Sequence, residues 1–260
     1  MISTDSSLPQ KTCALGRFTF ATLHDDPWEQ DPGLRSFFDS IETFERDAHW
    51  GMVGWNANHA VLAFRGTDSN LEWAHSMTFK QIAWFEGRAH AGFIQALDTV
   101  WEQVLAAIYD AHVIEQQKTL WVCGHSLGGA LALLAADHLQ RMGCTVLEVF
   151  TYGTPCVFDA VAARAYPVPV YSVINNEDPV PKFTWPTLFD TYECLGEEIF
   201  LLASGAVAES RHSHHLARKI DRANSIGSGI LEAGMINDHF MREYVRKLEL
   251  WAKASDRVSP

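Results

Sequence analysis

A Gly-His-Ser-Leu-Gly segment at residues 124–128 constrains this chain more than any other stretch. In a Gly-x-Ser-x-Gly motif the serine lies on a strained turn between a strand and a helix, which presents its hydroxyl as a nucleophile. The flanks fit this geometry, because residues 119–123 are a β-prone apolar run and residues 130–136 are strong helix formers. Glycines suit the turn because a neighbouring Cβ would crowd the serine. The motif therefore predicts a strand, a tight turn at Ser126 and a helix.

Length and charge narrow the class of protein. The 260 residues carry a formal net charge of −12, which argues against nucleic-acid partners and against polybasic attachment to anionic membranes. No apolar run approaches the length of a transmembrane segment. Residues 1–7 have neither a basic nor an apolar region, so no secretory signal is visible. The compartment stays open between the cytoplasm and export by a signal-independent route.

The hydrophobic pattern predicts one α/β domain over residues 1–260. Strands that alternate with helices through the middle of the chain indicate a central, mostly parallel sheet flanked by helices on both faces. Flanking hairpins are expected as its antiparallel edges. The expected helices are 34–44, 93–112, the one after Ser126, and 239–251; the expected strands are 51–55 with 60–64 as a hairpin, 119–123, 146–152, 168–174, and 192–195 with 198–202 as a second hairpin.

The five cysteines form no metal or redox motif, and their number is odd. Cys123 belongs to the strand before Ser126, where a small buried side chain is expected. Cys144 and Cys156 flank the next strand, and spacing alone does not decide whether they pair. We expect reduced, structural thiols.

A serine nucleophile requires a base and an orienting carboxylate. In α/β-hydrolases these follow the serine in the order acid, then histidine. Asp178 follows the strand 168–174 and precedes a proline, so it is the candidate acid; an ordinary turn-capping role is the alternative. His239, at the start of the last helix, is the candidate base. Three further histidines satisfy the same order but lie in a polar stretch that is typical of a solvated loop: His212, His214 and His215.

An oxyanion hole needs two hydrogen-bond donors. One is expected from the backbone N–H of Leu127, the residue after the nucleophile. The second is expected from the loop after the strand 60–64, where Thr67 offers both its N–H and its hydroxyl.

Taken together, these segments resemble the class 3, or fungal-type, triacylglycerol lipase family of the α/β-hydrolase superfamily. The matching pieces occur in family order: Phe64-Arg65-Gly66-Thr67, His90-Ala91-Gly92-Phe93, residues 124–130, Thr151-Tyr152-Gly153-Thr154-Pro155, Asp178-Pro179-Val180-Pro181, and Asp238-His239 followed by Tyr244. The resemblance implies an α/β-hydrolase fold, a Ser126–Asp178–His239 triad, an oxyanion hole at Thr67 and Leu127, and no cofactor or metal.

By the same resemblance, the chain is expected to hydrolyse carboxylic esters of acylglycerols through an acyl-enzyme at a lipid–water interface. A phospholipase, a feruloyl-type esterase and an acyltransferase would use the same residues. A non-catalytic lipid-binding protein that kept the fold is the alternative of a different class. The chain departs from secreted family members in showing no signal peptide and no evident disulfide set.

Residues 68–73 match the start of the family's lid, and we expect the lid to extend over residues 68–86, which carry a dense apolar set. A mobile amphipathic cover would shield the acyl site in water and turn toward lipid at an interface. The alternative is a segment packed permanently on the sheet. The side chains assigned to the lid and acyl site are Leu71, Trp73, Met77, Phe79, Trp84 and Phe85.

Overall fold

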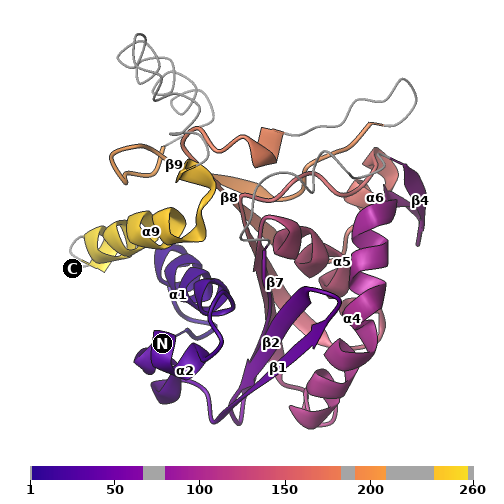
Figure 1. The fold of residues 1–260 in the computed structure, drawn as a ribbon, viewed down its shortest axis with the longest axis horizontal. Coiled ribbons are helices and arrows are strands. Elements are labelled where there is room, and N and C mark those ends of the chain that lie inside the picture. Colours follow the sequence, from indigo (N-terminus) through magenta and orange to yellow (C-terminus); the bar gives the residue numbers. More distant parts are fainter. Residues whose placement is uncertain (1, 67–79, 183–190, 209–236, 257–260) are drawn as a thin grey trace.

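A sheet covered by helices on both faces forms the centre of the computed structural model (Figure 1). The structure describes residues 2–66, 80–182, 191–208 and 237–256. Within these residues the main sheet has the strand order β1-β2-β3-β6-β7-β8-β9. Its strands are β1 (Ser40–Arg46), β2 (His49–Trp55), β3 (His59–Phe64), β6 (Thr119–His125), β7 (Thr145–Tyr152), β8 (Val170–Asn175) and β9 (Glu197–Leu201).

Strand pairing divides this sheet into an antiparallel edge and a parallel remainder. β1, β2 and β3 form an antiparallel meander, whereas β3, β6, β7, β8 and β9 pair in parallel in that order. Phe64 of β3 aligns with Gly124 of β6, and His125 of β6 aligns with Tyr152 of β7. The carboxyl ends of these strands therefore meet at one edge of the sheet, where open α/β sheets bind their ligands.

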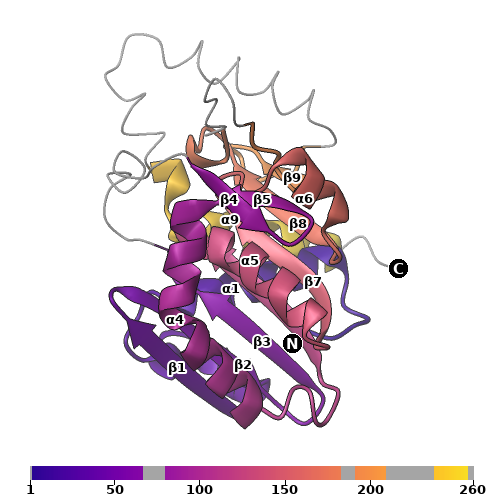
Figure 2. The same cartoon turned by 90° about the vertical axis from the view of Figure 1, so that its right-hand side faces the viewer.

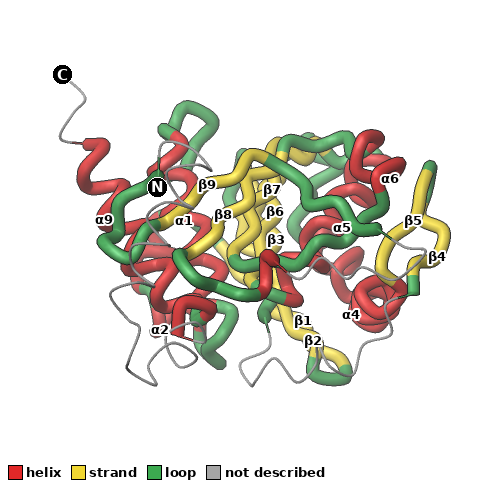
Figure 3. The backbone as a smooth tube through the Cα atoms, turned by 90° about the horizontal axis from the view of Figure 1, so that it is seen from above, coloured by secondary structure: helices red, strands yellow, loops and turns green. Residues whose placement is uncertain are grey.

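Helices cover the two faces of the sheet in two groups. Viewed from above, α4 (Ala91–Asp110), α5 (Leu127–Arg141) and α6 (Ala160–Ala165) lie on one side of the strands, and α1 (Leu8–Ala21), α2 (Pro27–Gln30) and α9 (Met241–Asp256) lie on the other (Figure 3). Two short 3₁₀ turns complete the described helices, η1 (Pro32–Ser36) and η2 (Val180–Lys182). No helix of the described residues is long and apolar enough to cross a bilayer.

The strand β6 shows how the sequence builds both cores. Leu120 and Val122 pack in the core under α4 and α5, whereas Trp121 and Cys123 pack in the core under α1 and α9. Successive side chains of a strand point to opposite faces, so a continuous apolar run is the pattern of a strand buried on both sides.

The expected helix over residues 34–44 is wrong. Only η1 is helical there, and residues 40–46 form β1, paired with β2. Phe38 packs on Phe18 at 4.8 Å between ring centroids, in the core under α1, whereas Phe44 packs on Phe64 at 5.9 Å on the other face. The aromatic residues have the spacing of one helix face, but the segment is a bend followed by a strand. Phe38 and Phe44 pack on opposite faces of the sheet, which one helix face could not do.

The second expected hairpin is also wrong, although its latter half exists as β9. β9 pairs in parallel with β8, and Glu193 instead bridges Phe158. Gly196 permits the bend before β9, because its φ is +97° and an added Cβ would lie 2.6 Å from the carbonyl oxygen of Val170. The hairpin 51–55 with 60–64, the helix over 93–112 and the strands at 119–123, 146–152 and 168–174 are confirmed within a few residues.

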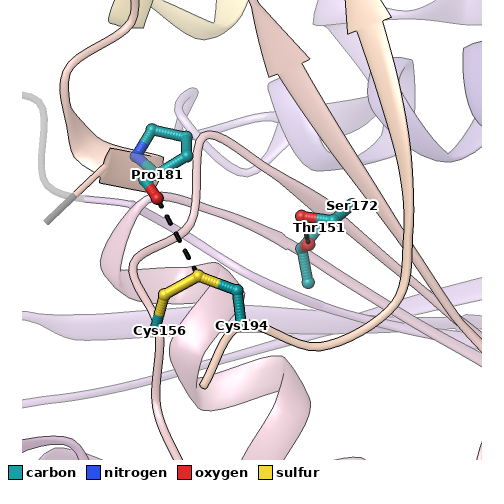
Figure 4. Close-up of a disulfide and its surroundings, with 5 residues drawn as sticks. All are labelled: Thr151, Cys156, Ser172, Pro181 and Cys194. Atoms are coloured by element: carbon teal, nitrogen blue, oxygen red, sulfur yellow. Dashed lines mark hydrogen bonds between the residues drawn. A yellow bond between two sulfur atoms is a disulfide. The ribbon is translucent and has the colours of Figure 1, made fainter. Parts of the chain in front are cut away.

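The expectation that the cysteines are reduced is wrong for two of them. Cys156, after β7, is bonded to Cys194, before β9, whereas Cys13, Cys123 and Cys144 are free thiols (Figure 4). The sulfur of Cys194 lies 3.9 Å from the carbonyl oxygen of Pro181. The crosslink therefore joins the segment after β7 to the segment before β9. Spacing in the sequence does not reveal this pairing.

Helix α1 was not anticipated from the sequence. A capping box marks its start, because Ser7 and Gln10 satisfy each other's backbone N–H groups, and a proline follows in the first turn. The serine–glutamine spacing at residues 7–10 is the signal that could have identified it.

Candidate active site

The turn at Ser126 joins β6 to α5 without an intervening loop. Ser126 has φ 54° and ψ −124°, a backbone conformation that residues other than glycine rarely adopt. An added Cβ at Gly124 would overlap the carbonyl oxygen of Gly128, and one at Gly128 would lie 2.6 Å from the carbonyl oxygen of Arg65. Glycine is therefore required on both sides of the serine, because Gly124 packs against the start of α5 and Gly128 against the backbone at the end of β3.

Ser126 and His239 are hydrogen-bonded to one another. Oγ of Ser126 lies 2.9 Å from Nε2 of His239, and both residues are buried. Nδ1 of the same ring lies 3.0 Å from each carboxylate oxygen of Asp178. An ionised carboxylate only accepts, so Nδ1 donates and Nε2 of the neutral ring is left to accept the serine proton. This is the tautomer that a general base requires.

Asp178 occupies a fully buried pocket beyond the end of β8. Besides His239, its carboxylate accepts from the backbone N–H of Val180 at 2.9 Å and from the hydroxyl of Tyr244 at 2.5 Å. Burial, followed by the charge of Asp178, raises the pKa of Tyr244 well above its usual range, so this hydroxyl remains a donor. Gly153, at φ +58°, passes so close that an added Cβ would lie 2.5 Å from Oδ2 of Asp178.

His125 is adjacent to the serine but faces elsewhere. Its Nε2 donates to the main-chain oxygen of His239 at 2.6 Å. Burial, and then the proximity of His239, lower the pKa of His125 well below its usual value, so the ring stays neutral. It therefore supports the segment that carries His239.

The structure assigns local packing roles to two further histidines, His90 and His138. His90 caps α4 by accepting from the N–H of Phe93 at 3.3 Å, and His138 stacks on Trp101. The three histidines that competed with His239 for the role of base, His212, His214 and His215, lie outside the described residues. Among the described residues, no group of three or more His, Cys, Asp or Glu side chains could hold a metal ion.

One of the two expected oxyanion donors falls within the described structure. Leu127 is the first residue of α5, and the N–H groups of a helix's first turn have no partner within the helix. Thr67 lies outside the described residues, which end at Gly66 beside the turn: an added Cβ there would lie 2.7 Å from the carbonyl oxygen of His125.

The lid assignment divides into two parts. Leu71, Trp73, Met77 and Phe79 lie outside the described residues. Trp84 and Phe85 belong to a two-stranded hairpin of β4 (Gln81–Trp84) and β5 (Gly87–His90), seen beside α6 in Figure 2. The indole N–H of Trp84 donates to Asp137 at 2.8 Å, and the guanidinium of Arg141 lies 4.1 Å from the ring centre of Phe85.

Asp137 and Arg141 belong to the last turns of α5, whereas Ser126 precedes its first turn. At 1.5 Å per residue, Asp137 lies about 16 Å along the helix from the serine. Trp84 and Phe85 are therefore held at the far end of α5 and do not line the site around Ser126. Trp84 is thus fixed to α5 rather than to the sheet, whereas Phe85 remains 49% exposed beside Arg141.

The polar support of the triad was not identified from the residues themselves. Asn175, Asp238 and Lys247 are joined by hydrogen bonds behind Asp178 and His239. Tyr244 entered the sequence argument only as part of a resemblance, without its partner. A buried lysine on the apolar face of the last helix was the available signal, because a buried ammonium requires a partner.

Comparison with known proteins gives a consistent result. The model of the lipase (class 3) family matches residues 61–187. A secreted mono- and diacylglycerol lipase of Fusarium solani is 32% identical over 147 residues, which cover 54% of this chain and 43% of the relative. A lipase of Rhizomucor miehei is 32% identical over 130 residues, covering 46% and 36%. A chloroplastic phospholipase A1 of Arabidopsis thaliana is 30% identical over 129 residues, covering 46% and 18%.

Solved structures agree on the fold. The triacylglyceride lipase of Rhizomucor miehei superposes with a TM-score of 0.61 at 23% identity, covering 75% of this chain and 81% of that one. Lipase II of Rhizopus niveus gives 0.61 at 20% identity, covering 75% and 82%. The chain is thus an α/β-hydrolase fold protein. Over residues 61–187 it is similar to the class 3 lipase family, and the alignments span less than half the length of these curated relatives.

Proposed function

We propose that this chain is a serine hydrolase that cleaves carboxylic esters of acylglycerols, with Ser126 as nucleophile, His239 as base and Asp178 as the orienting acid. The observation that carries the proposal is the 2.9 Å contact between Oγ of Ser126 and Nε2 of His239, whose other nitrogen is held by Asp178. Similarity to the class 3 lipase family supports an ester substrate, since two of the three relatives compared are named as lipases and the third as a phospholipase.

The reaction steps follow from the tautomer of His239, whose Nε2 is free to accept a proton. Oγ of Ser126 attacks the ester carbonyl carbon while Nε2 of His239 takes the serine proton. The oxyanion is stabilised by the N–H of Leu127 and, in the proposal, by Thr67. The bond to the alcohol breaks as His239 returns the proton to the leaving oxygen, which leaves an acyl-enzyme. Water then attacks the acyl carbon and gives a proton to Nε2 of His239, and as the acyl–oxygen bond breaks His239 passes this proton to Oγ of Ser126, which releases the carboxylic acid and the free serine.

The decisive experiment is Ser126→Ala in the full chain. Loss of the nucleophile should lower kcat on p-nitrophenyl butyrate by about 10⁴- to 10⁶-fold without unfolding the protein. A fluorophosphonate should label the wild type at Ser126 and leave the variant unlabelled. Near-normal turnover by the folded variant would overturn the assignment. Absence of both labelling and turnover in the wild type would favour a non-catalytic lipid-binding protein.

Two partner assignments need separate tests. Alanine at His239 should abolish activity, whereas alanine at His212, His214 or His215 should leave it unchanged. An inactive His214→Ala enzyme beside an active His239→Ala enzyme would reverse the assignment.

Thr67→Val removes a hydroxyl at nearly constant volume and should lower kcat by about 10²- to 10³-fold with little change in KM. A rise in KM at constant kcat would show that Thr67 only binds substrate.

A phospholipase is the second candidate, favoured by the relative named as a phospholipase A1. The two functions differ in the head group that the site accepts. Rates on mixed micelles of triolein, diolein and phosphatidylcholine, measured with one enzyme preparation, separate them. Feruloyl esters, and transfer to added alcohols, test the esterase and acyltransferase alternatives in the same assay.

Interfacial activation through the part of the 68–86 segment that precedes β4 is part of the proposal, with its support in the apolar composition of residues 71–79. The complete burial of Ser126 is consistent with a covered site. Activity on a short-chain ester should rise abruptly when emulsion forms, and Trp73→Ser should weaken that rise while the rate on dissolved ester is retained. A smooth rise through the solubility limit in both proteins would indicate an esterase without interfacial activation.

A further inference from the structure

A lysine is buried behind the triad, on the face of α9 that packs toward β8. Lys247 is 2% exposed, and its ammonium donates to Oδ1 of Asn175 at 2.5 Å and lies 3.8 Å from a carboxylate oxygen of Asp238. Burying an ammonium costs several kcal/mol unless charged and polar partners compensate. Lys247 is therefore held where it is by the groups that it contacts, and these groups are the neighbours of the triad.

Asp238 is the second member of this network and directly precedes His239. Its other carboxylate oxygen accepts from the side-chain amide of Asn176 at 2.9 Å and from the backbone N–H of Glu177 at 3.2 Å. Its main-chain oxygen accepts from the side-chain amide of Asn175 at 2.8 Å. Both the side chain and the backbone of Asp238 are thus bonded to the turn 175–177.

That turn leads directly into Asp178. The network consequently joins Asp238, the residue before His239, to residues 175–177 before Asp178. Lys247 is hydrogen-bonded to Asn175 and forms an ion pair with Asp238. Tyr244, one helical turn earlier on the same helix, accepts from the N–H of Asn175 at 3.2 Å and donates to Asp178. Burial raises the pKa of Asp238, and the charge of Lys247 opposes this rise.

We propose that Lys247 is a positioning residue of the triad: its ammonium binds Asn175 and faces Asp238, which holds the segment carrying His239 against the turn carrying Asp178. This inference rests on the proposed hydrolase function. Lys247 contacts Asp238, next to His239, and Asn175, in the turn that leads to Asp178. Lys247 therefore acts through the spacing of His239 and Asp178. A displacement of about 1 Å in such a pair costs about 10²-fold in rate.

The test compares Lys247→Met, which removes the charge at similar length, with Lys253→Met, which alters an exposed lysine of the same helix. Enzyme concentrations are set by the folded fraction. Lys247→Met should lower kcat on dissolved p-nitrophenyl butyrate by about 10²-fold, with KM within about twofold, and should slow fluorophosphonate labelling of Ser126 in parallel. Lys253→Met should match the wild type in all three.

A second variant, Asp238→Asn, preserves the shape of the network and should lower kcat about tenfold. Because Lys247 and Asp238 belong to the same network, the double variant should lower kcat by only about 10²-fold relative to wild type. This loss is smaller than the product of the two single losses. Lys247 is only structural if Lys247→Met lowers the melting temperature while kcat per folded molecule stays within threefold of wild type. Fully multiplicative losses in the double variant would likewise overturn the proposal.

If Lys247→Met does not fold, Asp238→Asn decides by the same threefold limit. Failure of the proposed function itself would look different. In that case the wild type would neither turn over esters nor react with the fluorophosphonate, whereas failure of this inference leaves a labelled, active wild type.

Discussion

The hydroxyl of Tyr244 donates to Oδ2 of Asp178 at 2.5 Å, in a pocket where the carboxylate is fully buried. Asp178 thereby accepts from His239, Val180 and Tyr244. A buried carboxylate that loses one such donor is left with part of its desolvation cost uncompensated. The tyrosine therefore fixes Asp178, the proposed triad acid, from a helix that begins just after His239.

Tyr244→Phe should reduce both stability and turnover. Removing the hydroxyl should cost about 1–3 kcal/mol in the free energy of unfolding. It should also lower kcat about tenfold, because Asp178 gains freedom to rotate away from His239. Urea denaturation and ester hydrolysis measure the two effects. Tyr166→Phe is the matched control, since that hydroxyl donates to the carbonyl of Leu133, away from the triad; an equal loss of kcat there would show a non-local effect.

Two glycines that flank α5, Gly124 and Gly143, allow the cost of steric overlap to be separated from the cost of backbone strain. Gly124 lies on β6, where an added Cβ would overlap the carbonyl of Gly128, whereas Gly143 has φ +95° and nothing within 4 Å of an added Cβ. Gly143→Ala should cost about 1–2 kcal/mol from backbone strain alone. Gly124→Ala should cost at least about 3 kcal/mol, because backbone must move. Chemical denaturation of both variants gives the comparison, and equal costs would contradict the overlap.

The disulfide between Cys156 and Cys194 should stabilise the chain through the unfolded state. The crosslink joins cysteines 38 positions apart. Closing such a loop removes unfolded-state entropy worth about 4 kcal/mol on the loop-closure model. The double variant Cys156→Ser/Cys194→Ser should therefore lose about 2–4 kcal/mol in the free energy of unfolding. Its kcat should stay within about threefold, because Asp178 keeps its bonds to Val180 and Tyr244. Unchanged stability would mean that the thiols do not pair in solution.

The parts of the fold that could be predicted from the sequence are those in which one local pattern has one structural solution. The run around β6 is apolar on both faces, and the glycines around Ser126 fit only a tight turn, so the strand, turn and helix could be predicted together. Asp178 and His239 were identified by their order in the chain and by their positions, one after a strand and the other at the start of a helix. Their 3.0 Å approach depends on contacts that no local pattern contains.

The failures have a common physical cause, namely partners that are distant in the chain. Phe38 and Phe44 were assigned to one helix face because their spacing allowed it, but their ring partners lie on opposite sides of the sheet. Cys194 pairs with a residue 38 positions earlier. Trp84 was assigned to a lid because it follows the segment that matches the family's lid and is apolar; its indole N–H is bonded to Asp137 on α5. Hydrophobicity predicts that a side chain is covered, without indicating by what.

His90 makes the stability of this protein depend on pH in a direction that can be derived. The ring is fully buried, and its Nδ1 accepts from the N–H of Phe93 at the start of α4, so the neutral ring carries its proton on Nε2. Burial lowers the pKa of His90 from 6.5 to about 4. Between these values the unfolded chain binds a proton that the folded chain does not, so the stability contributed by His90 is fully present above pH 6.5 and is lost as the pH falls toward 4.

The variant His90→Asn isolates this contribution, because asparagine also accepts at a helix N-cap but does not titrate. From pH 7 to pH 5 the free energy of unfolding of the wild type should fall by about 2 kcal/mol more than that of His90→Asn. Other buried histidines, His125 among them, titrate in both proteins and cancel in the difference. Urea denaturation of the two proteins at both pH values provides the measurement. Parallel loss of stability in the two proteins would show that His90 is protonated in the folded state at pH 5, and that the buried ring has access to water.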